Sequence, residues 1–250
     1  MHVIELRFEC FDNTTLTAAE KTINGLLEAY RANGQILGRE FAVAINDGEF
    51  RVRLLMPEKS SLAKRFNSPW VKRALCELTN AKLLAPREKY IGQDINSEVS
   101  SSKAPSWQLV YTSYVHMCSP VRNGDTLQPI PLYQLPATFN GDHKCIIRWQ
   151  TEWQACDELQ MAAATKAESS DLFRRGWDLR GRVEYLTAIP TYYYLYRVGG
   201  ESLTSEKAHP CPRCGNKDWL LMAKFNVSCA MYHAPCVIVF TQPNQYKGQY

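Results

Sequence analysis

Four of the nine cysteines of this 250-residue chain fall within its last forty residues. Cys211 and Cys214 have two residues between them, and Gly215 follows directly. Two thiolates at this spacing can bind one Zn²⁺ ion at about 2.3 Å, while backbone amides of the turn donate to the sulfur atoms. Gly215 permits the positive φ that such a turn requires. The segment is typical of the first half of a zinc ribbon and predicts one structural Zn²⁺ per chain.

The remaining ligands are expected among the residues that follow. Strand-like stretches at Trp219–Met222 and Phe225–Cys229 predict a hairpin that returns Cys229 to the same ion. Cys236 directly precedes the apolar run Val237–Phe240, which predicts a third strand. The predicted metal ligands are Cys211, Cys214, Cys229 and Cys236.

The second half of this site is irregular, which leaves other ligand sets open. A regular ribbon has a cysteine three positions after Cys229, and Tyr232 stands there. His233 or His209 is therefore an alternative fourth ligand. His233 and Cys236 also have two residues between them. They can form the second pair themselves and leave Cys229 without metal.

Two further interpretations concern the same cysteines. The pair Cys211 and Cys214 is also the spacing of a redox-active motif, although those motifs usually open a helix. The tail can also be a hairpin that has lost its metal. Where four protein residues hold zinc, no position stays open for water, so the ion is expected to stabilise the tail and not to catalyse.

The composition places the chain among globular proteins. Hydrophobic residues make up 45% and charged residues 22%, which excludes a mostly disordered chain, a collagen and a coiled-coil rod. No stretch approaches the roughly 20 apolar residues that span a bilayer, and the N-terminus lacks the apolar core of a signal peptide. We therefore expect a cytoplasmic protein with reduced cysteines and no membrane partner. The net charge of +4 leaves a nucleic-acid partner open without favouring it.

The first part of the chain alternates between strand and helix patterns. A helix is predicted from Thr17, where Glu20 completes a capping box, to Gly34. A second helical stretch, residues 60–80, is interrupted where Ser68 caps a new segment with Pro69 at its first position. The predicted strands are His2–Cys10, Phe41–Ile45, Phe50–Met56 and Leu83–Ile91. The order β-α-β-β-α-β predicts a ferredoxin-like sandwich over residues 1–93.

The rest of the chain predicts an α+β protein with two further parts. Residues 93–105 have the composition of a linker. A mixed helical and β region follows over 106–198, and a zinc-ribbon-like hairpin over 199–250 completes the α+β fold. The elements expected in the mixed region are a strand at Trp107–Cys118, an irregular stretch at 119–136, a helix from Asp142 to Thr165, a helix at Ser170–Ala188 and a strand at Thr191–Val198.

Several segments together resemble a known family. They are Cys118–Asp125, Pro129–Tyr133, Trp149–Cys156, Ile189–Tyr196 and Cys211–Gly215. The chain resembles an uncharacterised bacterial family described as zinc-ribbon-containing, for which nucleic-acid binding has been suggested. The resemblance covers most of the chain from about residue 107 onward, and it implies a structural zinc ion and a DNA or RNA partner. The second knuckle departs from this family, in which similar proteins carry two closely spaced cysteines.

Basic residues gather at two places, which is the pattern that a phosphate backbone requires. The candidate nucleic-acid contacts are Arg174, Arg175, Arg180 and Arg182, and a second basic group consists of Lys64, Arg65, Lys72 and Arg73. The tyrosines of Tyr192–Tyr196 are of the type that stacks on unpaired bases. Against this prediction, three acidic residues interleave with the first group, and such a helix face can neutralise itself. They are Asp171, Asp178 and Glu184.

No pattern in the chain predicts catalysis. The sequence has no Gly-rich phosphate loop, nucleophile elbow or HExxH motif. Glu152, Asp157 and Glu158 largely fall off the apolar face of their predicted helix, which favours a charged outer surface. We therefore predict a non-enzymatic module and infer no small-molecule substrate; an enzyme stays open as an alternative, but no residues are candidates for its catalysis.

The partner of this module is predicted to be nucleic acid, with a second protein as the alternative. For an adaptor protein with a structural or lost zinc site, Pro129–Pro136 can present an extended, polyproline-like face. Binding to nucleic acid is expected to fall steeply with salt, whereas an adaptor is expected to tolerate moderate salt.

Overall fold

The computed structural model describes residues 1–11, 13–95, 98–101, 103–112, 117–160, 171–198, 220–222, 229–233 and 236–241, with backbone alone for 156–160, 194–198 and everything from 220 onward. The chain divides into two compact units. The first consists of Met1–Ala104, Val115–Val121 and Gln128–Ile147, and the second of Pro105–Tyr114, Arg122–Leu127 and Arg148–Tyr250.

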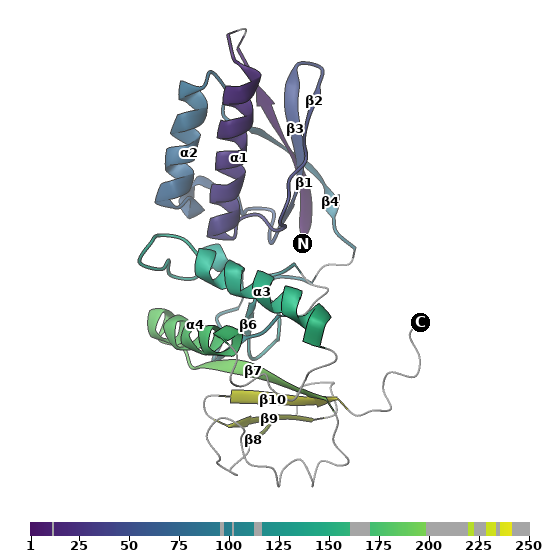
Figure 1. Cartoon of the computed structure of the whole chain (residues 1–250), viewed down its shortest axis with the longest axis vertical. Coiled ribbons are helices and arrows are strands. Elements are labelled where there is room, and N and C mark those ends of the chain that lie inside the picture. Colours follow the sequence, from purple (N-terminus) through teal and green to yellow (C-terminus); the bar gives the residue numbers. More distant parts are fainter. Residues whose placement is uncertain are drawn as a thin grey trace. The chain divides into compact units, whose positions relative to one another are not determined.

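The first unit contains a four-stranded sheet with two helices on one face (Figure 1). Its strands lie in the order β2-β3-β1-β4, and each neighbouring pair is antiparallel. In chain order the elements are β1 (His2–Glu9), α1 (Leu16–Asn33), β2 (Val43–Asn46), β3 (Glu49–Met56), the short 3₁₀ helix η1 (Lys64–Phe66), α2 (Pro69–Asn80) and β4 (Arg87–Gln93). The predicted order β-α-β-β-α-β is therefore the observed order.

The core of this unit follows from two sequence periods. Ile4, Leu6 and Phe8 alternate along β1 and are all at most 2% exposed. They pack in one hydrophobic cluster with Ile23 and Leu26, which share a face of α1. The sheet buries one face under the helices, while its opposite face carries the charged residues of the same strands.

Two of the predicted helix ends are confirmed, whereas the strand ends of the first unit shift by up to four residues. Gly34 ends α1 in the left-handed region, at φ 76°. Ser68 caps α2 by accepting from the Val71 amide, and Pro69 is the first helical residue. The predicted capping box at Thr17 is wrong. Thr15 caps α1 instead, with its hydroxyl accepting from the Ala18 amide, because the helix begins one residue before Thr17.

The second unit contains a mixed six-stranded sheet in the order β6-β5-β7-β10-β9-β8. β7 is parallel to both β5 and β10, whereas β9 is antiparallel to both β10 and β8. The elements from residue 105 onward are β5 (Gln108–Val110), β6 (Val121–Asn123), the 3₁₀ helix η2 (Leu132–Gln134), α3 (Lys144–Gln160), α4 (Asp171–Thr187), β7 (Thr191–Val198), β8 (Leu220–Met222), β9 (Cys229–His233) and β10 (Cys236–Thr241).

The structure differs from the prediction in this region in two ways. Among the described residues of the strand expected at Trp107–Cys118, only Gln108–Val110 form a strand, β5; residues 113–116 lie outside the description. The strands after residue 199, expected as a separate tail, share one sheet with β7. Hydrogen bonding between β10 and β7 is long-range in sequence, and nothing in the local pattern of either strand specifies it.

No helix within the described ranges combines the length and the apolar character needed to cross a membrane.

Candidate metal and nucleic-acid sites

The hairpin of β9 and β10 arranges three of the predicted metal-ligating residues. In its register, His233 stands directly opposite Cys236, and Cys229 stands opposite Phe240. His233 and Cys236 are thus the residues that flank the turn of the hairpin. Cys229 is at the other end of the paired region. Cys211, Cys214 and His209 lie outside the described residues.

Strand geometry gives the scale of this arrangement. Residues directly opposite in an antiparallel pair have Cα atoms about 4.5–5.5 Å apart. Cys229 is four residues from His233 along β9, which corresponds to roughly 13 Å at about 3.3 Å per residue. Two cysteines that bind one Zn²⁺ ion through Zn–S bonds of about 2.3 Å have Cα atoms closer together than this. The register therefore brings His233 and Cys236 together and keeps Cys229 away from both.

The residue types at the turn suit zinc. Three cysteines and one histidine form a common tetrahedral set for a structural zinc ion. Cys211, Cys214, His233 and Cys236 supply that set in two pairs, each with two residues between its members. Among the side chains that the structure describes, no three His, Cys, Asp or Glu residues come together as a metal site.

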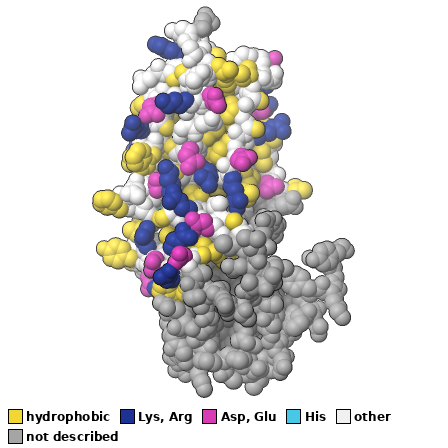
Figure 2. Space-filling view, in the orientation of Figure 1, with side chains coloured by type: hydrophobic (Ala, Val, Ile, Leu, Met, Phe, Trp, Pro, Cys, Tyr) yellow, Lys and Arg dark blue, Asp and Glu magenta, His cyan; other side chains and the backbone are white. Residues whose placement is uncertain are grey.

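Three arginines of α4 form ion pairs with acidic groups. Arg174 forms an ion pair with Asp171, and Arg175 Nη1 lies 2.5 Å from Glu152 Oε2. Across the visible face of the described residues, basic and acidic side chains are interspersed in the same way (Figure 2). Local pairing cancels part of the field that a phosphate backbone would sense. The helix therefore offers less positive charge than its four arginines suggest.

Arg180 has a packing role in the second unit. Its side chain is 14% exposed, forms an ion pair with Glu184 and donates to the carbonyl of Thr191 at 3.0 Å. The guanidinium also lies over the Trp177 ring, 4.9 Å from its centroid. Arg180 thereby links α4 to the start of β7. Arg182 is exposed on the same helix.

The tyrosines considered for base stacking are partly internal. Tyr193 is 4% exposed, and its ring packs edge-on against Phe173 and Trp149. Burial raises the pKa of its hydroxyl well above the usual range. Tyr192 packs edge-on against Trp107 at 5.5 Å. These two rings belong to the packing of the second unit and are not free faces for bases.

The basic group at η1 and α2 has a different environment. Lys64, Arg65 and Lys72 are exposed, and no ion pair involves them within the described part of the chain. Arg73, the fourth member, pairs with Glu77 at 3.0 Å. Trp70 lies beside them and is 47% exposed, a residue that the sequence pattern did not single out. Its position between Pro69 and Val71 marks it as helical, but only the structure shows it at the surface.

The segment considered for a protein partner is packed within the first unit. Residues 129–133 are all buried. The Tyr133 hydroxyl donates to Glu58 Oε2 at 2.7 Å, and its ring lies 4.6 Å from that of Phe66. Residues 129–133 of the segment Pro129–Pro136 are therefore covered by the chain's own residues, whereas Gln134 and Pro136 are exposed.

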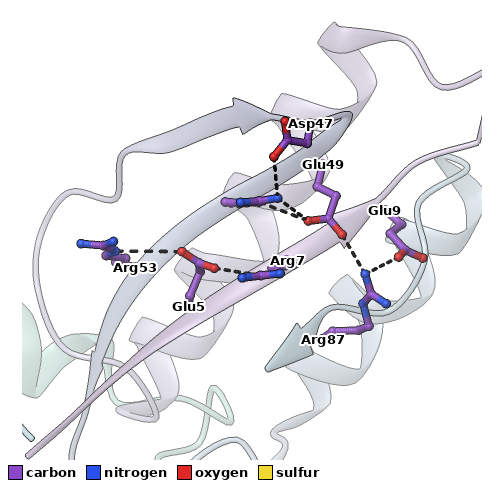
Figure 3. A network of polar contacts seen from close by, with 8 residues as sticks. Glu5, Arg7, Glu9, Asp47, Glu49, Arg53 and Arg87 are labelled. Atoms are coloured by element: carbon purple, nitrogen blue, oxygen red, sulfur yellow. Dashed lines mark hydrogen bonds and ion pairs between the residues drawn. The ribbon is translucent and has the colours of Figure 1, made fainter. Parts of the chain in front are cut away.

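A network of ion pairs covers the outer face of the first sheet (Figure 3). Arg51 bridges Asp47 and Glu49, and Arg87 bridges Glu9 and Glu49. A hydrogen bond from Arg7 lowers the pKa of Glu5. An open cavity of about 560 Å³ lies at one end of the network, beside Cys10 and Phe11. Since its charged lining is internally paired, we assign it no ligand.

Comparison with known proteins shows where this chain belongs. Residues 1–92 match one domain of unknown function (DUF8589), and residues 102–196 match another domain of unknown function (DUF2310). A solved structure from Deinococcus radiodurans, provisionally described as an antibiotic biosynthesis monooxygenase, has a TM-score of 0.27 and 17% identity, covering 38% of this chain and 96% of its own.

Two uncharacterised proteins of Haemophilus influenzae are close in sequence. One is 44% identical over 141 residues, which cover 52% of this chain and 69% of that protein. The other is 39% identical over 237 residues, covering 88% of this chain and 90% of that protein. Neither protein is described as having a zinc ribbon or binding nucleic acid. This chain matches the DUF8589 and DUF2310 domains in turn. Because the 39% identity extends over nine-tenths of the relative, the chain belongs to the same bacterial family as that Haemophilus influenzae protein.

Proposed function

We propose that this protein is a non-enzymatic nucleic-acid-binding module whose C-terminal region is held by one structural Zn²⁺ ion. The first unit is, in this proposal, a ferredoxin-like sandwich, which its element order and its sheet order support. Sheets of this kind can present side chains to RNA. The zinc ion gives rigidity and takes no part in a reaction.

The observation that carries the zinc proposal is the register of β9 and β10. His233 and Cys236 face each other across the turn and repeat the two-residue spacing of Cys211 and Cys214. We therefore favour these four residues as ligands over a set that includes Cys229. A complete shell of four protein ligands leaves no site for water, which supports a structural role.

The metal proposal is tested by measuring the zinc content of the purified full chain and of single variants. We expect about one zinc per chain in the wild type. Cys211→Ser and Cys236→Ser should lose it, and Cys229→Ser should keep it. Cys76→Ser is the matched control, because Cys76 is exposed on α2, far in sequence from the tail.

Each outcome of the zinc measurement has a definite meaning. Loss of zinc from both Cys229→Ser and Cys236→Ser would restore the set of Cys211, Cys214, Cys229 and Cys236. Absence of zinc from a folded, reduced wild type would overturn the metal proposal altogether.

The nucleic-acid proposal is tested separately, by the salt dependence of binding. For a protein that binds several phosphates, the logarithm of the binding constant falls linearly with the logarithm of the salt concentration. We expect this behaviour for a fluorescently labelled oligonucleotide measured by anisotropy. Absence of binding at low salt would overturn this part of the proposal and leave the zinc assignment untouched.

A further inference from the structure

The stretch from Glu58 to Lys82 concentrates positive charge. It contains six basic residues and two acidic ones, Glu58 and Glu77. Glu77 pairs with Arg73, and Glu58 accepts hydrogen bonds from Tyr133 and Gln134. Among the described residues, these two carboxylates therefore contact Arg73, Tyr133 and Gln134 and not the other basic residues of the stretch. Lys64, Arg65 and Lys72 are exposed, and the Arg65 guanidinium lies over the Phe66 ring, 4.7 Å from its centroid.

Lys64, Arg65 and Lys72 are close in the chain, on η1 and in the first turn of α2. The Asn67 amide donates to the Lys64 carbonyl, and the Lys72 amide donates to the Ser68 carbonyl, so that η1 runs directly into the first turn of α2. We call Lys64, Arg65, Trp70 and Lys72 the η1–α2 corner.

The helix itself adds to this positive field. The first turn of α2 contains no acidic residue, although the N-terminal end of a helix dipole favours negative charge. Lys72 stands at that end instead, where its charge is unfavourable for the helix. An anion bound at the corner would relieve this repulsion and interact favourably with the dipole.

Two exposed aromatic side chains belong to the same part of the first unit, Trp70 in the first turn of α2 and Phe139 in the segment that accepts its hydrogen bond. Trp70 is 47% exposed, and its Nε1 donates to the carbonyl of Asn140 at 2.7 Å, which fixes the ring at the surface. Phe139, next to Asn140 in the chain, is fully exposed. Exposed aromatic rings, together with cations that form no ion pair within the described residues, offer the two contacts that single strands use: stacking on bases and attraction to phosphates.

We propose that the η1–α2 corner binds single-stranded nucleic acid, with Lys64, Arg65 and Lys72 on phosphates and Trp70 and Phe139 stacked on bases. This inference rests on the proposed nucleic-acid function and assigns it a surface and a substrate class. A duplex would satisfy the cations but would leave both rings without an unpaired base. An acidic protein partner would satisfy the cations in the same way.

The test uses the full chain and fluorescence anisotropy with a labelled single strand and the duplex of the same sequence. The double variant Lys64→Ala/Arg65→Ala should weaken binding and reduce the slope of log K against log salt by about 1.4, since each phosphate contact contributes roughly 0.7 for single strands. The matched control is Arg174→Ala/Arg175→Ala, which removes the same charge from paired positions on α4.

Aromatic variants test the stacking. Trp70→Ala should weaken single-strand binding about tenfold, and Trp70→Phe should restore most of it. Phe139→Ala is a second aromatic variant. It leaves no cavity in the core, because the Phe139 side chain is already fully exposed.

The outcomes separate this inference from the proposed function. If the wild type binds but the α4 control loses as much affinity as the corner variant, the surface is wrong and the function stands. Equal binding of duplex and single strand, or no effect of either aromatic variant, would overturn the single-strand assignment. A wild type that binds neither nucleic acid would overturn the function together with the surface, and would favour an acidic protein partner.

Discussion

His143 is a buried titratable group in the first unit. Its side chain is 1% exposed, and Nδ1 has no hydrogen-bond partner among the described residues. Burial lowers its pKa from 6.5 to about 4, although the adjacent Asp142 acts in the opposite direction. The imidazole is therefore neutral in the folded protein at pH values where the unfolded chain binds a proton.

This depressed pKa predicts acid sensitivity. Below pH 6.5 the unfolded state takes up a proton that the folded state excludes, so stability is present above the unfolded pKa and falls as the pH is lowered. We expect the free energy of unfolding to drop by up to about 1.4 kcal/mol per pH unit between pH 6 and 5. Urea unfolding of wild type and His143→Leu checks this. The same pH dependence in both proteins would contradict the prediction.

The residues of the candidate metal site were only partly predictable from the sequence. The spacing of Cys211 and Cys214 is a local signal, so the sequence suffices to propose this pair as metal ligands. The choice between Cys229 and His233 depends on which residues stand opposite each other in a hairpin, and a register is a property of two strands. The arginines of α4 show the same limit, because the pairing of Arg175 with Glu152 joins two helices.

At the scale of elements, α4 shows how one position controls packing. Gly176 is buried, and a Cβ atom there would overlap the ring of Tyr193 and Nε1 of Trp149. Gly181 is on the same helix, and a Cβ atom there would have nothing within 4 Å. Substitution by alanine is therefore expected to change stability in opposite directions at Gly176 and Gly181.

We expect Gly176→Ala to destabilise the protein by about 1–3 kcal/mol, because the added methyl group overpacks the aromatic cluster. Gly181→Ala should instead stabilise it by roughly 0.5–1 kcal/mol, since alanine is the better helix former. The midpoints of urea unfolding measure both changes. A gain of stability in Gly176→Ala would show that α4 does not pack so closely on β7.

Helices and strands with strong local signals were predicted well. The Ser68–Pro69 pair marks the start of α2, and Gly34 marks the end of α1, because caps are chemical properties of one or two residues. Trp107–Cys118 has the composition of a long strand, but among its described residues only Gln108–Val110 pair with β7. Strand formation depends on an available partner edge, which composition does not contain.

At the scale of the whole chain, two of the candidate zinc ligands, His233 and Cys236, belong to the sheet of the second unit. β10 pairs in parallel with β7 along its whole length, from Cys236 opposite Tyr193 to Thr241 opposite Val198. On the other side of β7, β5 pairs only with Thr191–Tyr193. Within the described residues, the second half of β7 thus has β10 as its single neighbouring strand.

This topology predicts how far the loss of zinc propagates. The free energy of a structural zinc site is folding free energy, so a chelator or Cys211→Ser should loosen the β9–β10 turn and then β10. Hydrogen exchange should accelerate at the amides of residues 194–198, while those of Thr191–Tyr193 keep part of their protection through β5. Amides of β1 and β3, which pair with each other in the first unit, should exchange as before. Unchanged protection of residues 194–198 after complete removal of zinc would mean that β10 is held in the sheet by its apolar residues alone, and that the ion orders only the turn.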